Sequence, residues 1–170
     1  MLMKTLVVYY SRTGNTKKIG DEIAAALEAD VEELKDDVNR GGPVGFVKSG
    51  REAKSGTLVN LDPLLHEPST YDLVVIGTPV WARTMCSPVR TFLLNNDLGN
   101  ARVAWFCTVG ASSRSFMASC FEAMTDESGR PSVATAGFSA KDTRSNHSQA
   151  ITDFATTLKA AMGRVRNGVA

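Results

Sequence analysis

The 170-residue sequence lacks the features of several protein classes. Nineteen Lys and Arg nearly balance eighteen Asp and Glu, so the formal net charge is only +1. This balance argues against a strongly basic nucleic-acid-binding surface. It also argues against the heavy acidity with which many soluble electron carriers steer their partners. No apolar run approaches the roughly 20 residues that a membrane helix requires. We therefore expect no nucleic-acid partner and no membrane partner.

Cysteine and histidine are also scarce. The three cysteines include no C-x-x-C pair, so a disulfide framework is not expected. The short apolar run at residues 6–10 is followed by no small-residue cleavage site, so a signal peptide is not expected either. Neither histidine has a neighbour at ligand spacing, and no metal site is predicted. A reduced, cytoplasmic protein is the resulting interpretation.

Strand-like and helix-like patterns alternate along the whole chain. Strands are predicted at residues 5–10, 31–34, 71–77, 101–108 and 131–138, and helical periods occupy residues 19–29, 87–93, 116–124 and 151–162. This alternation is typical of a parallel sheet with helices on both faces. The length corresponds to one domain, residues 1–170. Residues 36–56 form a glycine-rich insertion with at most one helix. Two roles remain open for this insertion, namely a lid and a contact within an oligomer.

Residues 11–16, Ser-Arg-Thr-Gly-Asn-Thr, separate the first strand from the first helix. Backbone N–H groups at a helix start have no intrahelical partner and attract anions, most often phosphate. The hydroxyls of Ser11, Thr13 and Thr16 add donors, and Gly14 allows a close approach of the backbone. Cations in the first turn, at residues 17–18, are ordinarily unfavourable but become favourable beside a bound dianion. The loop predicts a phosphate site, with an ordinary Ser/Thr-rich cap as the alternative.

Better-known phosphate loops do not fit this sequence. The patterns G-x-x-x-x-G-K-[ST] and G-x-G-x-x-G are both absent. A phosphatase loop, with Arg six positions after Cys, fails from Cys107 because Arg114 comes one position too late. A receiver domain would carry acidic residues after the first strand, where Ser11 and Arg12 stand.

Two segments together resemble the flavodoxin family. Residues 9–16, YYSRTGNT, resemble its FMN phosphate loop, which follows the pattern [ST]-x-T-G-x-T after the first strand. Residues 72–81, DLVVIGTPVW, are similar to its third strand and the flavin-ring loop that follows. The resemblance spans nearly the whole chain. It implies an α/β fold, namely a flavodoxin-like doubly wound five-stranded parallel sheet of order 2-1-3-4-5 with helices on both faces, and FMN as the cofactor.

The resemblance also implies that three loops bind FMN. The implied residues are Ser11, Arg12, Thr13, Gly14, Asn15 and Thr16 at the phosphate, Thr78, Pro79, Val80, Trp81, Ala82 and Arg83 beside the flavin ring, and Thr108, Val109, Gly110, Ala111 and Ser112 at the pyrimidine edge. Trp81 is expected to stack on one ring face, with a core-rim tryptophan as the alternative. No catalytic side chain is implied, because the cofactor carries the chemistry.

The third loop departs from the family pattern. Many members carry a second aromatic residue there, whereas Ser112 and Ser113 stand in this sequence. One flavin face is therefore expected to be open, or covered by a partner. An open face predicts direct reduction of the flavin by NADH or NADPH.

Three functions remain open at this point. The first is an FMN-dependent redox protein that transfers electrons to a redox partner protein. The second is an NAD(P)H-dependent quinone reductase that acts on a small-molecule quinone, which the near-neutral charge and the missing aromatic favour. The third is a non-redox domain that binds another phosphorylated ligand. The sequence does not determine the oligomeric state.

Overall fold

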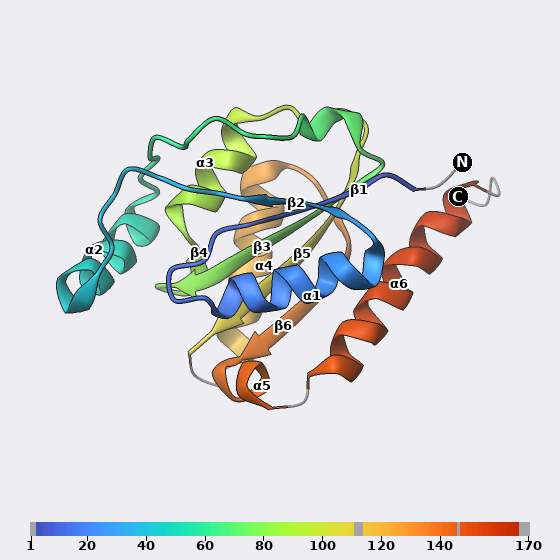
Figure 1. Ribbon diagram of the computed structural model, residues 1–170. Helices are drawn as coiled ribbons and strands as arrows, with labels where there is room; N and C mark the ends of the chain where they lie inside the picture. The colour runs from blue at the N-terminus through green and yellow to red at the C-terminus, as the bar shows by residue number, and fades with distance from the viewer. Residues whose placement is uncertain (1–2, 111–113, 146, 167–170) are drawn as a thin grey trace.

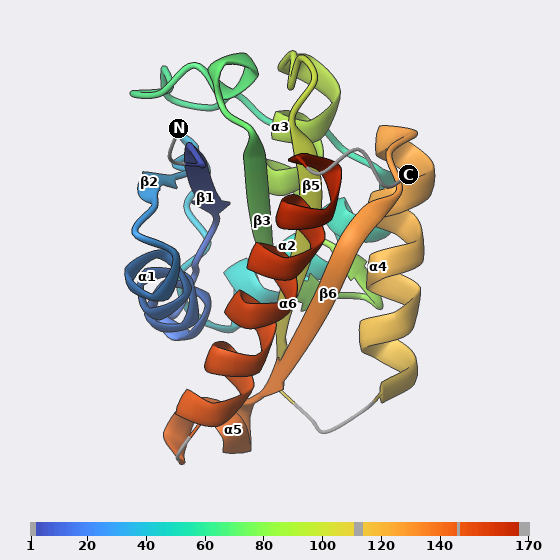
Figure 2. The ribbon, with the colours of Figure 1, turned by 90° about the vertical axis from the view of Figure 1, so that its right-hand side faces the viewer.

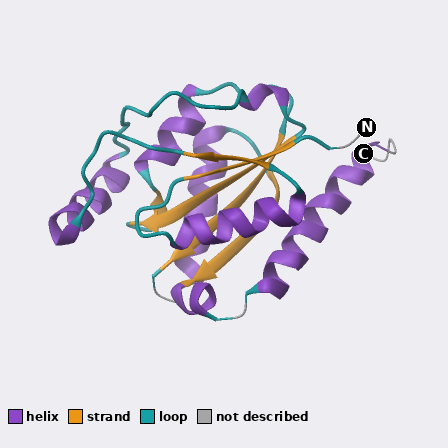
Figure 3. Ribbon diagram, viewed as in Figure 1, coloured by secondary structure: helices purple, strands orange, loops and turns teal. Residues whose placement is uncertain are grey.

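Five parallel strands and one short antiparallel strand form a single twisted sheet (Figures 1 and 3). The computed structural model describes residues 3–110, 114–145 and 147–166. The strands are β1 (Thr5–Tyr9), β2 (Asp30–Glu33), β3 (Leu73–Trp81), β4 (Thr84–Met85), β5 (Arg102–Val109) and β6 (Ser132–Ser139). The helices are α1 (Asn15–Leu27), α2 (Gly42–Ser55), α3 (Ser87–Asn95), α4 (Arg114–Ser128), α5 (Ala140–Arg144) and α6 (Ser148–Arg166), with a 3₁₀ turn at Pro68–Thr70. The parallel strands follow the order β2-β1-β3-β5-β6.

Helices cover both faces of the sheet, so the predicted α/β architecture is confirmed. Figure 2 shows α1 and α6 on one side of the sheet and α4 on the other. Successive strand residues point to opposite faces. In β3, Val75 joins the apolar cluster under α1 and α6, whereas Val74 and Ile76 join the cluster under α3 and α4. Burial on both faces explains why the central strands are continuous apolar runs.

The predicted count of five strands is wrong, because β3 continues past its expected end and turns back as β4. The strand extends through Trp81, and β4 pairs with it antiparallel, with Trp81 opposite Thr84. The turn residues Ala82 and Arg83 have φ angles of 49° and 69°. Two-residue hairpin turns of this kind favour Asn and Gly, and neither occurs here. The sequence therefore carried no turn signal for this hairpin.

Helix α5 was also absent from the predictions, because five residues are too few to show an apolar period. A capping box holds its start. The Ser139 N–H donates to the Asp142 carboxylate at 2.6 Å, and the Asp142 N–H donates to Ser139 Oγ at 3.3 Å. Hydrogen bonds that Ser139 donates to the Asp142 carboxylate, first from its side chain and then from its backbone, hold the pKa of Asp142 below its ordinary value. Within the described residues, no helix is both long and apolar enough to cross a membrane.

Candidate functional site

A cavity of about 180 Å³ lies at the carboxyl edge of the sheet, beyond the ends of β1, β3 and β5. Ligands of open α/β sheets bind at this edge. The cavity brings together these residues predicted for the site: Arg12, Thr13, Asn15, Thr16, Pro79, Val80, Trp81, Thr108, Val109 and Gly110. It does not include Ser11, Gly14, Thr78, Ala82 or Arg83. The predicted residues Ala111 and Ser112 lie outside the described residues.

The start of α1 forms one end of the cavity and is suited to an anion. Gly14 has a φ of 90°, in the left-handed region that glycine adopts without strain. Its N–H donates to Ser11 Oγ at 3.1 Å, which closes the turn. The helix begins without a side-chain cap and without an acidic residue in its first turn. Its first backbone N–H groups are therefore available to a negatively charged ligand.

The two lysines of the first turn have protein partners. Lys17 Nζ lies 3.1 Å from the Tyr9 hydroxyl and 3.2 Å from carboxylate oxygens of both Asp21 and Glu33. These hydrogen bonds, first that to Tyr9, raise the pKa of Lys17. Lys18 Nζ donates to the Thr143 carbonyl at 2.8 Å. Neither lysine lines the cavity, so the geometry does not support the idea that they neutralise a bound dianion.

A buried pair of hydroxyls joins two of the predicted loops. Thr16 Oγ1 and Thr108 Oγ1 lie 2.7 Å apart, and both side chains line the cavity. Only one of the two can donate within the pair, so the accepting hydroxyl keeps its own hydrogen. This pair connects the start of α1 to the end of β5 and can offer one donor to a ligand.

Trp81 forms part of the cavity wall but is largely packed into the protein. Its side chain is 8% exposed, and the guanidinium of Arg40 lies 5.2 Å from the centre of its ring. The Tyr10 ring packs nearly perpendicular to the indole at a centroid distance of 5.7 Å. The stacking of Trp81 on a flavin stays a prediction. Only the part of the indole surface that Arg40 and Tyr10 do not cover is available for such stacking.

Arg40 anchors the insertion of residues 36–56 to this wall. Its guanidinium donates to Asp36 at 2.6 Å and also to Glu52, and the Arg40 and Asp36 side chains are 2% and 3% exposed. Ser49 contributes a further contact to Arg40 at 3.4 Å. Burial raises the pKa of Asp36 against the opposing effect of Arg40. The insertion therefore contains a buried, paired charge cluster that lies directly against Trp81.

Three predicted residues around the β3–β4 hairpin lie away from the cavity. The buried Thr78 hydroxyl accepts the Cys86 N–H at 3.0 Å, and so braces the hairpin. Arg83 places its guanidinium 4.9 Å from the centre of the Phe116 ring on α4. Ala82 occupies the turn between β3 and β4. Thr78, Ala82 and Arg83 could contact a flavin only if part of the ligand extended outside the cavity.

Three cavity residues were absent from the predictions, namely Phe46, Ala140 and Thr143. Ala140 and Thr143 belong to the unpredicted α5, so no sequence signal identified them. Phe46 belongs to α2, and Arg12 lies over its ring at 5.2 Å. Arg12 also donates to the Arg40 carbonyl at 3.3 Å. The only sequence signal for Phe46 was the presence of a large aromatic residue in the glycine-rich insertion.

The three cysteines of the described residues are not suited to act as nucleophiles. Cys86, Cys107 and Cys120 are buried, and burial raises the pKa of Cys86 to about 12. A thiol that stays protonated is a poor nucleophile. No cluster of His, Cys, Asp or Glu capable of holding a metal ion occurs in the part of the chain that the structure describes.

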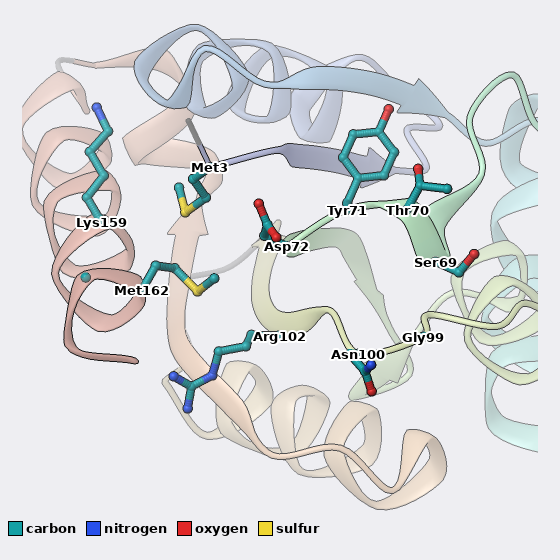
Figure 4. A pocket seen from close by; sticks show the side chains of 11 residues that line it. Met3, Ser69, Thr70, Tyr71, Asp72, Gly99, Asn100, Arg102, Lys159 and Met162 are labelled. Atoms are coloured by element: carbon teal, nitrogen blue, oxygen red, sulfur yellow. The ribbon is translucent and has the colours of Figure 1, made fainter. Parts of the chain in front are cut away.

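A larger cavity of about 650 Å³ lies at the opposite edge of the sheet (Figure 4). Its wall includes Asp72, Arg102 and, from α6, Lys159 and Met162. The polar groups in it are partly satisfied by the protein. Asp72 accepts the backbone N–H of Lys4 at 2.8 Å, and Lys159 donates to the Ala26 carbonyl at 2.9 Å. This cavity lies at the amino ends of the strands, away from the loops that the sequence singled out.

The sequence matches no protein-family model and no curated protein. Solved structures do match. A flavoprotein from Lactobacillus acidophilus NCFM in complex with FMN is 23% identical, with 79% of this chain and 93% of that chain covered and a TM-score of 0.64. A protein from Bacteroides uniformis that is assigned as a flavoprotein is 21% identical, with 90% and 97% covered and a TM-score of 0.75. Oxidised flavodoxin 2 from Bacillus cereus is 18% identical, with 92% and 98% covered and a TM-score of 0.58. The chain therefore has the flavodoxin fold.

Proposed function

We propose that this protein binds FMN at the carboxyl edge of the sheet and acts as a redox protein that passes electrons to a partner protein. The observation that carries the proposal is the cavity between the uncapped start of α1 and the apolar end of β3. A phosphate suits the start of α1, and a flat, partly apolar ring suits the end of β3. The flavodoxin fold and the solved complex of a flavoprotein with FMN add support.

The residues divide into two groups by the part of FMN that each would hold. The N–H groups of residues 15–17, with the hydroxyls of Thr13 and Thr16, would hold the phosphate, and the Thr108 hydroxyl would donate to Thr16 Oγ1. Pro79, Val80 and Trp81 would contact the ring, and backbone groups of residues 108–112 would bind its pyrimidine edge. Bound FMN supplies one- and two-electron redox chemistry. The protein positions the ring and limits its access to solvent. We further propose that residues 1–170 act as one cytoplasmic domain.

Titration with FMN and FAD tests this proposal. A single phosphate loop without a dinucleotide fingerprint suits one terminal phosphate, so FMN is expected to bind more tightly than FAD. Flavin fluorescence quenching measures both affinities, and the visible absorption spectrum of the purified protein reports any flavin that co-purifies. Equal affinity for FAD would contradict the assignment of the phosphate loop. Absence of binding to either flavin would favour the non-redox phospho-ligand domain.

The NAD(P)H-dependent quinone reductase is the second candidate, favoured by Ser112 and Ser113 in place of a second aromatic residue. The two functions differ in their reaction with nicotinamides. An electron-transfer protein is expected to stay oxidised when it is mixed anaerobically with NADH or NADPH, because hydride transfer requires the donor in contact with the flavin. Stopped-flow absorbance of the flavin band measures this. Bleaching within seconds, followed by turnover with a small quinone, would establish the reductase instead.

A further inference from the structure

We propose that Phe46 of α2 is the aromatic side chain that covers the flavin ring at the mouth of the cavity, in place of the aromatic residue missing from the loop after β5. The inference rests on the proposed function. It gives the insertion of residues 36–56 a role as a wall of the cofactor site, contributed by a segment outside the three flavin-binding loops.

The size of the cavity means that part of a bound FMN molecule would lie outside it. Ligand pockets commonly measure about 300–1,000 Å³. The cavity here measures about 180 Å³, so it encloses only part of an FMN molecule. With the phosphate at the start of α1, the rest of the ligand extends to the cavity mouth. Phe46 is part of the cavity lining there, although its side chain is 64% exposed.

The exposure of Phe46 distinguishes it from a packing residue. Burial of an aromatic side chain is strongly favourable, so a phenyl ring left mostly in water at a ligand cavity is available to a partner. Val47, the next residue of α2, is similarly exposed at 60%, but it lines a separate hollow formed by residues of α2 alone. The two neighbours therefore share exposure and differ in what they face.

One contact of the Phe46 ring and the packing of the neighbouring Gly45 fix the position of Phe46. Arg12, from the predicted phosphate loop, lies over one face of the phenyl ring. This cation–π contact leaves the other face for a ligand. Gly45 packs so closely against the backbone of Arg40 that a Cβ atom at this position would lie 2.2 Å from the Arg40 carbonyl carbon. Arg40 in turn lies over Trp81. Phe46 and Trp81 are thus connected through Arg40, and α2 is fixed relative to the ring end of the cavity.

Phe46→Ala, with Val47→Ala as the matched control, tests the inference by flavin binding. Phe46→Ala is expected to weaken FMN and riboflavin by the same factor, roughly two- to twelvefold from the usual strength of an aromatic pair. Riboflavin lacks the phosphate, so equal losses identify a contact with the ring. Val47→Ala is expected to leave both affinities unchanged. Phe46→Trp is expected to retain affinity, and visible circular dichroism of the flavin bands should differ between the Ala and Trp variants.

Each outcome separates this inference from the proposed function. Failure of the wild-type protein to bind either flavin would overturn the proposed function. If the wild-type protein binds FMN and Phe46→Ala behaves like Val47→Ala, the inference on Phe46 is wrong while the proposed function stands. A loss for FMN without a loss for riboflavin would also overturn it, because Phe46 would then act through Arg12 at the phosphate. Thermal unfolding of the flavin-free variants checks the fold, and equal midpoints are expected because Phe46 is mostly exposed.

Discussion

Replacing Arg40 with Met is expected to lower the free energy of unfolding by about 3–5 kcal/mol, the range for removing one partner of a buried ion pair. The Arg40 guanidinium is bonded to Asp36 and Glu52, and the Arg40 and Asp36 side chains are almost completely buried. Met fills similar space but leaves a buried carboxylate without its cation. Urea unfolding followed by circular dichroism measures the loss. Arg51→Met, at an exposed position of helix α2 in the same insertion, is the matched control and is expected to change stability by less than about 0.5 kcal/mol.

The pH dependence of the Arg40→Met variant provides an internal check. Without Arg40, burial and the nearby carboxylates of Glu52 and Asp37 act unopposed on Asp36, so its folded-state pKa rises further above the unfolded value. A raised carboxyl pKa destabilises the folded state as the pH rises through it, and the destabilisation disappears at a pH below the unfolded value. The gap between variant and wild type should therefore narrow toward acid pH. Adding Asp36→Asn and Glu52→Gln should recover part of the loss at neutral pH. A gap that is constant with pH would show that Arg40 acts through packing alone.

Replacing Thr16 with Ala is expected to weaken FMN binding by roughly ten- to a hundredfold, the equivalent of about 1.5–3 kcal/mol for a hydrogen bond to a charged group. With the Thr108 hydroxyl donating to Thr16 Oγ1, the Thr16 hydroxyl is the member of the pair that can donate to a phosphate, and the substitution removes this donor. Fluorescence titration with FMN and riboflavin measures the effect. Riboflavin affinity should hardly change, because riboflavin has no phosphate.

Thr16→Ser is the matched control for this prediction, because it keeps the hydroxyl and removes only a methyl group. It is expected to bind FMN nearly as well as the wild-type protein. If Thr16→Ala weakens FMN and riboflavin equally, the buried pair maintains the shape of the two loops and does not contact the phosphate.

Much of the fold could be predicted from local sequence patterns. Residues 5–9 and 73–77 are buried at every position because both faces of a parallel sheet are covered, and this requirement leaves a nearly continuous apolar run in the sequence. The helices α1, α3, α4 and α6 show the helical period of residues that pack on one side. The loop of residues 11–16 could be predicted as a phosphate site because such a site at a helix start draws its donors from consecutive residues. In these cases, the physical cause acts within a few residues of the chain.

The tertiary structure alone decided the parts of the site that depend on distant residues. Trp81 could be expected at the ring, but its packing against Arg40 depends on how the insertion folds back over the end of β3. Phe46 reaches the cavity only because the charge cluster around Arg40 and the close approach at Gly45 fix α2 there. Thr16 and Thr108 meet because parallel strands bring their carboxyl ends to one edge. Sequence by itself determined which residues favour a phosphate and a buried sheet. Long-range packing determined which side chains surround the space between them, because such contacts leave no periodic pattern in the local sequence.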